Sequence, residues 1–140
     1  AQIDMYGNIN TTYIGSIDRP TVRLPGSGGA NDIASSAGRT VIIMSHGPNK
    51  LVKRLDYLTS PGALGGPGDR KRVGLLGGGP SLVVTDLCLL DFEEETKRAR
   101  LKAVHPGVTV EKVKSNTGFD LIIPERVEQT PPPTERNWRR

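Results

Sequence analysis

The chain has 140 residues, the length of one domain or of part of a larger protein, and 35% of them are hydrophobic. Aromatic residues make up 4%, too few for a surface that stacks the bases of single-stranded nucleic acid. The net charge of +4 comes from short basic clusters without a nucleic-acid-binding motif, so we expect solvated surface or contacts with a phosphate-bearing small molecule, and no nucleic-acid partner. The clusters lie at residues 50–54, 69–72, 97–100 and 136–140.

Cysteine content and hydropathy indicate the compartment. A single cysteine, Cys88, excludes an internal disulfide framework and is typical of a reducing compartment, so we expect a cytoplasmic protein. Cys88 lies within an apolar run, which favours a buried thiol over a nucleophile. Because no apolar segment approaches the roughly 18 residues that span a bilayer, we expect no membrane partner.

The chain begins with a predicted β-hairpin in residues 1–15. Its β-branched and aromatic residues favour strands, with a turn at residues 6–8, where Gly7 and Asn8 favour it, and a second strand over residues 11–14. Ile3 and Met5 already alternate with polar residues at the start, so we expect earlier strands of the same protein to precede this chain. Residues 18–20 are predicted to form a loop.

A glycine turn at residues 25–29 is the strongest candidate site. Glycines 26, 28 and 29 tolerate positive φ and allow a ligand to approach the backbone. Residues 30–37 are predicted to form a short helix, and Gly38 is expected to end it in the left-handed conformation. The free N–H groups before this helix could receive an anion or a developing oxyanion, although a glycine turn before a helix is common and, without other support, favours a purely structural interpretation.

The apolar residues 40–44 predict a strand buried on both faces, hence an α/β layered fold. His46 follows the carboxyl end of this strand, where open α/β sheets bind ligands, but a packing role is also compatible with its position. The apolar spacing in residues 50–58 predicts a helix. Residues 59–68 are rich in glycine and proline and predict a long irregular loop, either functional or mobile.

The second half of the chain predicts a hairpin, a helix and a last strand. Residues 81–92 predict one or two strands, and residues 99–104 alternate as a half-exposed strand. The glutamates at 93–95 are expected to form a solvated turn rather than a catalytic site. Thr109 is a good N-cap for a helix over residues 110–117, with Gly118 as a left-handed stop. Residues 121–123 predict a short strand, and residues 128–140 an extended or disordered tail.

Six short motifs occur in a characteristic order. They are residues 7–8, residues 26–36, the strand that ends at His46, and residues 83–86, 105–109 and 116–119. In order and spacing they resemble the β subunits of family I coenzyme A transferases, especially the glutaconate CoA-transferase-like branch. The resemblance extends to about Pro132, and by it residues 1–127 are similar to the carboxyl-terminal part of such a subunit.

The resemblance implies an α/β fold with an open layered sheet of the NagB/RpiA/CoA-transferase type, of which this chain is a partial subunit. It also implies an α subunit as partner, acyl-CoA and carboxylate substrates, no metal and no permanently bound cofactor. In the family, a glutamate attacks the acyl-CoA to give an acyl-glutamyl anhydride, and CoA then forms a glutamyl-CoA thioester. Covalent catalysis of this kind requires stabilised oxyanions.

The chain departs from the family pattern because it has no Glu-Asn-Gly motif. We therefore expect no catalytic residue here and a nucleophilic glutamate in an upstream segment, the amino-terminal part of the β subunit. By resemblance, Gly28, Gly29 and Ala30 supply backbone N–H groups to the acyl site. Gly26, Ser27 and Asn31 would shape the turn. Charge and loop position, not the resemblance, indicate that Lys50 or Arg72 contacts the CoA phosphates.

Two other functions stay open at this point. Relatives in steroid catabolism share the fold but hydrolyse a ring in a CoA ester, and they depart from the transferase pattern at the glycine turn. The missing glutamate also permits a non-catalytic subunit whose role is assembly.

Overall fold

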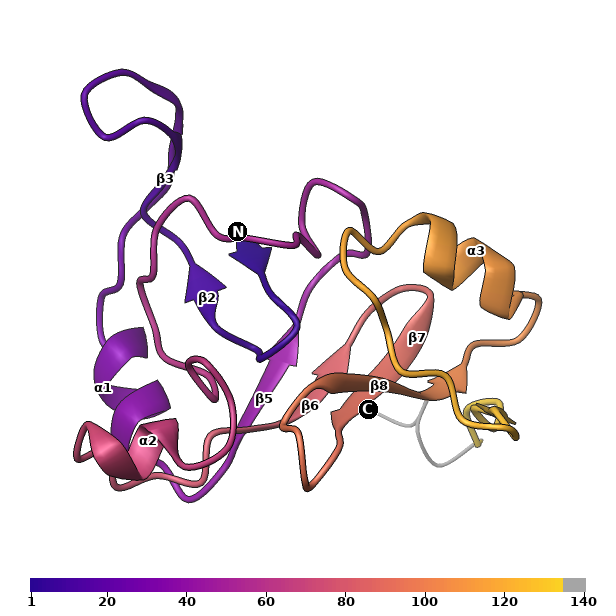
Figure 1. Cartoon of the computed structure of the whole chain (residues 1–140). Coiled ribbons are helices and arrows are strands. Elements are labelled where there is room, and N and C mark those ends of the chain that lie inside the picture. Colours follow the sequence, from indigo (N-terminus) through magenta and orange to yellow (C-terminus); the bar gives the residue numbers. More distant parts are fainter. Residues whose placement is uncertain (135–140) are drawn as a thin grey trace.

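The computed structural model describes residues 1–134, so the basic cluster at 136–140 and the last part of the expected tail lie outside the described residues (Figure 1). The elements in chain order are β1 (Gln2–Ile3), β2 (Ile9–Asn10), β3 (Tyr13–Gly15), β4 (Pro20–Arg23), α1 (Ala30–Ser36), β5 (Thr40–Ile43), α2 (Asp69–Arg72), β6 (Pro80–Val84), β7 (Cys88–Phe92), β8 (Ala99–Val104), α3 (Val110–Ser115) and β9 (Glu128–Gln129). Helices α1 and α2 lie at one end of the molecule and α3 at the other (Figure 1).

A five-stranded mixed sheet in the order β5-β6-β7-β8-β9 forms the centre of the fold. β5 runs parallel to β6, and β9 parallel to β8, whereas β6, β7 and β8 are antiparallel neighbours. The predicted hairpin of β7 and β8 is therefore confirmed, as are the two strands expected within residues 81–92. The core packs on this sheet and includes Ile3, Leu51, Val83, Leu90, Leu101, Val113 and Phe119.

A first hairpin is present, with β1 antiparallel to β2, but the strand predicted over residues 11–14 is wrong as the partner of β1: the partner is Ile9–Asn10, and Tyr13–Gly15 pairs with β4 instead. A second antiparallel pair, β3 with β4, extends away from the rest of the molecule (Figure 1). β4 begins at Pro20, although the sequence predicts a loop there. Proline has no N–H to donate, and the first residue of an edge strand tolerates this.

Residues 50–58 do not form the predicted helix. The N–H of Ile3 donates to the Lys50 carbonyl at 2.7 Å, and the N–H of Val52 donates to the Ile3 carbonyl at 2.8 Å. Leu51 thus pairs with Ile3 as a parallel bridge and is fully buried. Tertiary pairing with the first strand therefore prevails over the helical spacing of the apolar residues.

The irregular loop expected at residues 59–68 is confirmed, and Asn8 fixes its position. The Asn8 carboxamide oxygen accepts the N–H groups of Gly62 at 2.8 Å and Leu64 at 3.0 Å. Its amide nitrogen donates to Asp4 Oδ2 at 2.9 Å and to the Leu64 carbonyl at 2.8 Å. Burial raises the pKa of Asp4, against the lowering effect of its hydrogen bonds. The loop is thus tied to the first hairpin by one buried side chain.

β5 is a strand, as predicted, but the expectation of two buried faces is wrong. Val41 is 51% exposed and Ile43 81% exposed, while Thr40 and Ile42 are half-buried. β6 flanks β5 on one side, and β5 forms an edge of the sheet within the described chain. A continuous apolar run therefore lies with one face open.

The two glycines expected as left-handed helix stops do not take that conformation. Gly38 and Gly118 both lack positive φ, and α1 and α3 have Ala37 and Asn116 as C-caps. A Cβ on Gly118 would lie 2.5 Å from the Leu51 carbonyl oxygen, so this glycine permits a close backbone approach. The N-cap prediction is confirmed, because the Thr109 side chain accepts the N–H of Lys112 at 3.2 Å.

The last strand is shifted relative to the sequence prediction. Residues 121–123 contribute only an isolated bridge between Ile122 and Arg100. Instead, β9 joins the sheet beside Ala103 and Val104, so the first residues of the expected tail are extended and paired. The division of the chain at residue 127 stays an expectation.

Candidate functional site

The glycine turn at residues 25–29 joins β4 to α1 and is exposed to solvent over most of its length. Gly26 has φ of 89° and Gly28 of 48°, whereas Gly29, the N-cap of α1, has φ of −83°. A Cβ built on any of these three glycines would meet no atom within 4 Å. The turn is therefore open on its outer side, with two positions that favour glycine for their backbone conformation.

Two threonines of the segment between β2 and β3 hold this turn. The N–H of Gly26 donates to the Thr11 carbonyl at 2.7 Å, and the Thr11 hydroxyl donates to the Gly26 carbonyl at 2.8 Å. The N–H of Leu24 donates to the Thr12 carbonyl at 2.9 Å. Three hydrogen bonds thus fix the point at which the chain enters the turn.

Thr59 also holds this turn, through its contacts with Thr11 and Thr12, and it was not predicted as a site residue. Its buried hydroxyl accepts the N–H of Thr11 at 2.8 Å and lies 2.8 Å from the Thr12 hydroxyl. Its carbonyl accepts the Asn31 amide at 2.7 Å. Asn31, expected to shape the turn, thus contacts the residue that holds Thr11, and its role in the turn stays a prediction. A threonine before a proline-glycine loop gives no sequence signal of such a role.

The backbone donors of the turn are only partly used. Ala30 donates its N–H to the Ser27 carbonyl at 2.9 Å, and the Ser27 hydroxyl lies 3.1 Å from the Gly28 carbonyl, to which it donates. Among residues 1–134, the N–H groups of Gly28 and Gly29 have no protein acceptor. Of the three N–H groups expected to face an acyl group, the two glycine donors are thus free and that of Ala30 is engaged.

Arg70 of α2 connects the far end of α1 to the surrounding loops. Its guanidinium donates five hydrogen bonds of 2.9–3.3 Å, all to backbone carbonyls. The acceptors are Pro61, Gly62, Ala34, Ser35 and Gly77. Because every nitrogen of the fork donates to the backbone, Arg70 has a structural role. Sequence analysis noted it only as one member of a basic cluster.

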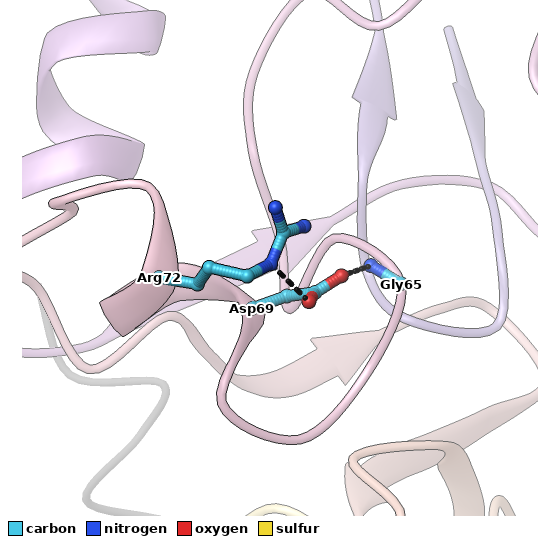
Figure 2. Close-up of polar contacts among 3 residues, drawn as sticks. All are labelled: Gly65, Asp69 and Arg72. Atoms are coloured by element: carbon cyan, nitrogen blue, oxygen red, sulfur yellow. Dashed lines mark hydrogen bonds and ion pairs between the residues drawn. The ribbon is translucent and has the colours of Figure 1, made fainter.

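Arg72, a predicted CoA contact, is paired on its own helix (Figure 2). Its Nε lies 3.1 Å from Asp69 Oδ1, while Asp69 Oδ2 accepts the N–H of Gly65 at 3.0 Å. The hydrogen bond from Arg72 is the main cause of the lowered pKa of Asp69. The Arg72 side chain is 69% exposed, so the pair lies at the surface.

Lys50, the other predicted CoA contact, ends the turn after His46 and donates from Nζ to the Ser45 hydroxyl. A cavity of about 810 Å³ lies beside α2, but neither Lys50, Arg72 nor any residue of the glycine turn lines it. The structure therefore does not bring Lys50, Arg72 and the glycine turn together in one cavity.

His46 lies at the carboxyl end of β5, as predicted, but its ring faces a polar network. Nδ1 is 3.1 Å from the Thr85 hydroxyl, and Nε2 is 3.0 Å from the Thr117 hydroxyl. Its backbone N–H donates to Asp86 Oδ1 at 2.6 Å. Burial lowers the pKa of His46 despite the nearby Asp86 carboxylate. These contacts support a packing role.

Cys88 and His105 extend this network. The Cys88 Sγ lies 3.7 Å from His46 Nδ1, and burial raises the pKa of this thiol to about 11. The burial of this thiol, expected from the sequence, is confirmed, and its raised pKa disfavours the nucleophilic thiolate. His105 Nε2 donates to the Thr85 carbonyl at 2.8 Å, and Nδ1 is 2.9 Å from the Thr130 hydroxyl. The network therefore links the loops after β5, β6 and β8.

The described chain offers few other reactive groups. The glutamates expected at a turn are found there, between β7 and β8, and Glu93 accepts the Thr96 hydroxyl at 2.5 Å. In residues 1–134, His, Cys, Asp and Glu side chains nowhere gather in threes as ligands for a metal ion. None of the helices in this part of the chain has the length and apolar character to cross a bilayer.

Comparison with known proteins identifies the family. The family model described as coenzyme A transferase matches residues 1–116. The chain belongs to the coenzyme A transferase family. It is 50% identical over 133 residues to a subunit of glutaconate CoA-transferase from Acidaminococcus fermentans, covering 94% of this chain and 50% of that subunit. It is 44% identical over 135 residues to a subunit of 3-oxoadipate CoA-transferase from Pseudomonas knackmussii, covering 96% and 52%.

The fold agrees with this membership. The crystal structure of glutaconate coenzyme A-transferase from Acidaminococcus fermentans superposes with a TM-score of 0.90 at 46% identity, covering 99% of this chain and 53% of that chain. The α/β fold expected for a CoA-transferase subunit is therefore confirmed. A more distant relative, the cholesterol ring-cleaving hydrolase IpdB subunit of Mycobacterium tuberculosis, is 27% identical over 134 residues, covering 96% of this chain and 53% of that subunit. The chain spans about half the length of the relatives it matches.

Proposed function

We propose that this chain is part of a CoA-transferase that moves CoA between an acyl-CoA and a carboxylate. Its nucleophilic glutamate would be supplied by a segment outside the 140 residues. The observation that carries the proposal is the 50% identity to a glutaconate CoA-transferase subunit, together with an intact glycine turn whose Gly28 and Gly29 N–H groups are free within the described chain. An α subunit and the remaining half of the β subunit would be its partners.

The glutamate carboxylate would attack the acyl-CoA carbonyl, releasing CoA thiolate and leaving an acyl-glutamyl anhydride. The thiolate would then attack the glutamyl carbonyl, which forms the glutamyl-CoA thioester and releases the first carboxylate. The acceptor carboxylate repeats both steps in reverse. Each attack passes through a tetrahedral oxyanion, and the chain's own contribution is to direct two backbone donors at it.

Because neighbouring threonines hold the turn in place, the N–H groups of Gly28 and Gly29 could suffice to stabilise the oxyanion. Backbone N–H groups stabilise an oxyanion best when they are positioned before the reaction starts. Thr11 and Thr59 fix the turn through backbone and hydroxyl contacts, so little reorganisation is needed when charge develops. A thioester substrate and no permanently bound cofactor are part of the proposal, as is a cytoplasmic location, which the single reduced cysteine supports.

Ring-opening hydrolysis is the second candidate, because the chain aligns with the IpdB subunit over 134 residues. The higher identity to two transferase subunits favours transfer. The two reactions differ in products: transfer conserves the thioester on a new acyl group, whereas ring-opening hydrolysis adds water to the donor and produces no new thioester. An assembly role without chemistry would give neither product.

The experiment reconstitutes the chain with the unmatched half of the glutaconate CoA-transferase subunit from Acidaminococcus fermentans and with the corresponding α subunit. Glutaconate-dependent exchange from acetyl-CoA, followed by mass spectrometry of the CoA esters, reports transfer. Gly28→Glu is expected to abolish transfer by placing a carboxylate at the acyl site. A Cβ at Gly28 meets no atom, and the positive φ of 48° adds a strain of about 1–2 kcal/mol, which the fold should tolerate. Gly74→Glu, at an equally open position with φ of 79°, is the matched control. Equal transfer by Gly28→Glu would refute the role of the turn.

A further inference from the structure

Two basic clusters that are distant in the sequence meet at the cavity beside α2. Lys71 belongs to the cluster at residues 69–72 and Lys97 to the cluster at residues 97–100, and both line the cavity of about 810 Å³. Lys102 of β8 is a third lysine in its lining. From the sequence, such clusters are compatible with solvated surface or with contacts to a phosphate-bearing small molecule. The fold gathers three of these cations around one hollow.

The ammonium groups of these three lysines are free. Of the lysines in residues 1–134, Lys50 alone donates a hydrogen bond from its side chain, and both ion pairs of this part of the chain are formed by arginines. Lys71, Lys97 and Lys102 therefore have no side-chain partner within residues 1–134, and each keeps three donors. A lysine ammonium is a point charge that binds phosphate oxygens well.

Two acidic residues share the cavity but do not neutralise the lysines. Asp91 is held by Arg100, whose Nε and Nη2 each donate to one of its carboxylate oxygens at 2.9 Å. Glu94 is exposed in the turn between β7 and β8 and forms no ion pair within residues 1–134. Three lysines thus share the lining with one free carboxylate. This excess of positive charge favours an anion with two or more charges.

The backbone at Lys97 is strained. Lys97 has φ of 59°, in the left-handed region that residues with a Cβ rarely adopt. It lies in the turn between β7 and β8, where its N–H donates to the Glu93 carbonyl at 2.9 Å. Glycine would form such a turn with less strain. Strained residues cluster at binding sites, so the backbone and the cavity draw attention to the same side chain.

The rest of the lining includes an apolar wall. Phe92 is half-buried and Leu76 is 91% exposed, and Leu75 and Pro80 lie beside them in the lining. Sites for small organic molecules have volumes of about 300–1,000 Å³ and combine apolar walls with a few charged groups. The cavity has both features, so it suits an organic molecule that carries phosphate groups better than it suits an inorganic ion.

We propose that this cavity binds a phosphorylated organic molecule of the nucleotide class. Its phosphate groups contact Lys71, Lys97 and Lys102. Its organic part lies against Phe92 and Leu76. A free nucleoside diphosphate and the nucleotide half of CoA share this chemistry, and the experiment separates these two sources. The site is distinct from the glycine turn, none of whose residues lines the cavity, and its geometry is independent of the proposed transfer reaction.

Calorimetric titration of the full chain with ADP and with CoA tests the site. We expect the wild type to bind at least one of them with a Kd of about 1 mM or tighter. Lys71→Gln/Lys97→Gln should weaken this binding by about tenfold or more, because two charge-assisted hydrogen bonds are lost. Lys112→Gln/Lys114→Gln removes the same charge from α3, at the other end of the molecule, and should bind within about twofold of wild type (Figure 1). Far-ultraviolet circular dichroism checks the fold of each variant.

The apolar wall is tested by Leu76→Ser with inorganic pyrophosphate as a second probe. This variant should weaken binding of the nucleotide by about threefold or more and leave binding of pyrophosphate within about twofold, because pyrophosphate has no organic part to contact Leu76. Equal binding of the nucleotide by Leu76→Ser and wild type would overturn the assignment to an organic ligand. Binding of neither ADP nor CoA by the wild type, or equal losses for the two lysine pairs, would overturn the site itself.

The reconstituted transferase distinguishes the two sources of the ligand. A KM for acetyl-CoA that rises in Lys71→Gln/Lys97→Gln assigns the cavity to the nucleotide half of CoA. An unchanged KM together with weakened binding of ADP assigns it to a free nucleotide, and either result supports the site. A complex that transfers no CoA, while the chain binds ADP through these lysines, would refute the proposed function and leave the site standing. Transfer by a chain that binds neither nucleotide would refute the site alone.

Discussion

His46 Nε2 lies 3.0 Å from the Thr117 hydroxyl, which joins the loop after β5 to the end of α3. The Thr117 hydroxyl donates to the Val113 carbonyl at 2.8 Å, so it accepts from His46, and Nε2 is the protonated nitrogen. The Thr85 hydroxyl, 3.1 Å from Nδ1, donates to the Cys88 carbonyl, which leaves the Cys88 thiol, 3.7 Å away, as the donor available to Nδ1. With the lowered pKa of His46, the Nε2 contact favours a neutral imidazole protonated at Nε2.

This tautomer predicts that stability falls in mild acid. Burial lowers the pKa of His46 in the folded chain, so the unfolded chain binds the proton more readily. The contribution of His46 is therefore present above the ordinary histidine pKa of about 6.5 and declines as the pH falls below it. Urea unfolding at about pH 7.5 and about pH 5.5 should show a smaller pH dependence for His46→Gln than for wild type. An equal pH dependence would contradict this assignment.

Gly62→Ala is predicted to destabilise the fold strongly. A Cβ at this position would lie 2.3 Å from the Gly7 carbonyl carbon and 2.4 Å from the Tyr6 carbonyl oxygen. Backbone atoms cannot move aside cheaply, so we expect a loss of about 1–3 kcal/mol in the free energy of unfolding. Gly38→Ala is the control, because its Cβ meets nothing and its φ is not positive. Urea titration should show Gly38→Ala within about 0.5 kcal/mol of wild type.

Arg70→Lys should destabilise the fold although it keeps the charge. An ammonium group cannot reproduce five hydrogen bonds from a planar fork, so carbonyls near α1 and Gly62 would lose donors. We expect a cost of about 1–3 kcal/mol. Arg72→Lys, at the exposed pair with Asp69, should change stability by less than about 0.5 kcal/mol. Similar unfolding midpoints for both variants would argue against the cross-linking role of Arg70.

Thr59→Val should loosen the glycine turn while keeping the side-chain shape. The Thr11 N–H and the Thr12 hydroxyl would both lose their partner, at a cost of about 1–3 kcal/mol. Amide exchange of Gly26, which donates to the Thr11 carbonyl, should become faster than in wild type. Thr21→Val, which alters an exposed threonine of β4, should leave that amide unchanged. Slow exchange of Gly26 in Thr59→Val would show that the turn does not depend on this hydroxyl.

The elements that local chemistry determines are predictable from the sequence. β8 has the predicted bounds because its side chains alternate with period two, and Thr109 caps α3 because its hydroxyl can accept a nearby N–H. The prediction was wrong where contacts between residues distant in the sequence determine the structure. The apolar residues in 50–58 have helical spacing, yet Leu51 pairs with Ile3 of the first strand in a parallel bridge.

The candidate site shows the same division. Glycines mark the turn itself, because Gly26 and Gly28 need positive φ. Thr59, which holds the turn through Thr11, lies 48 residues from Thr11 in the sequence, and no local sequence pattern predicts this contact. The open face of β5 was also beyond sequence reasoning, since an apolar run looks the same whether or not a neighbouring polypeptide covers it.

The pairing of β9 with β8 has a practical consequence for shortened versions of the chain. Removing residues beyond 127 would take away the strand beside Ala103 and Val104 and the threonine that contacts His105. β8 would then have an open side at Ala103 and Val104, its apolar end, in place of its polar neighbour. Such a truncated protein would be prone to self-association, and its behaviour in solution would not represent that of the intact sequence.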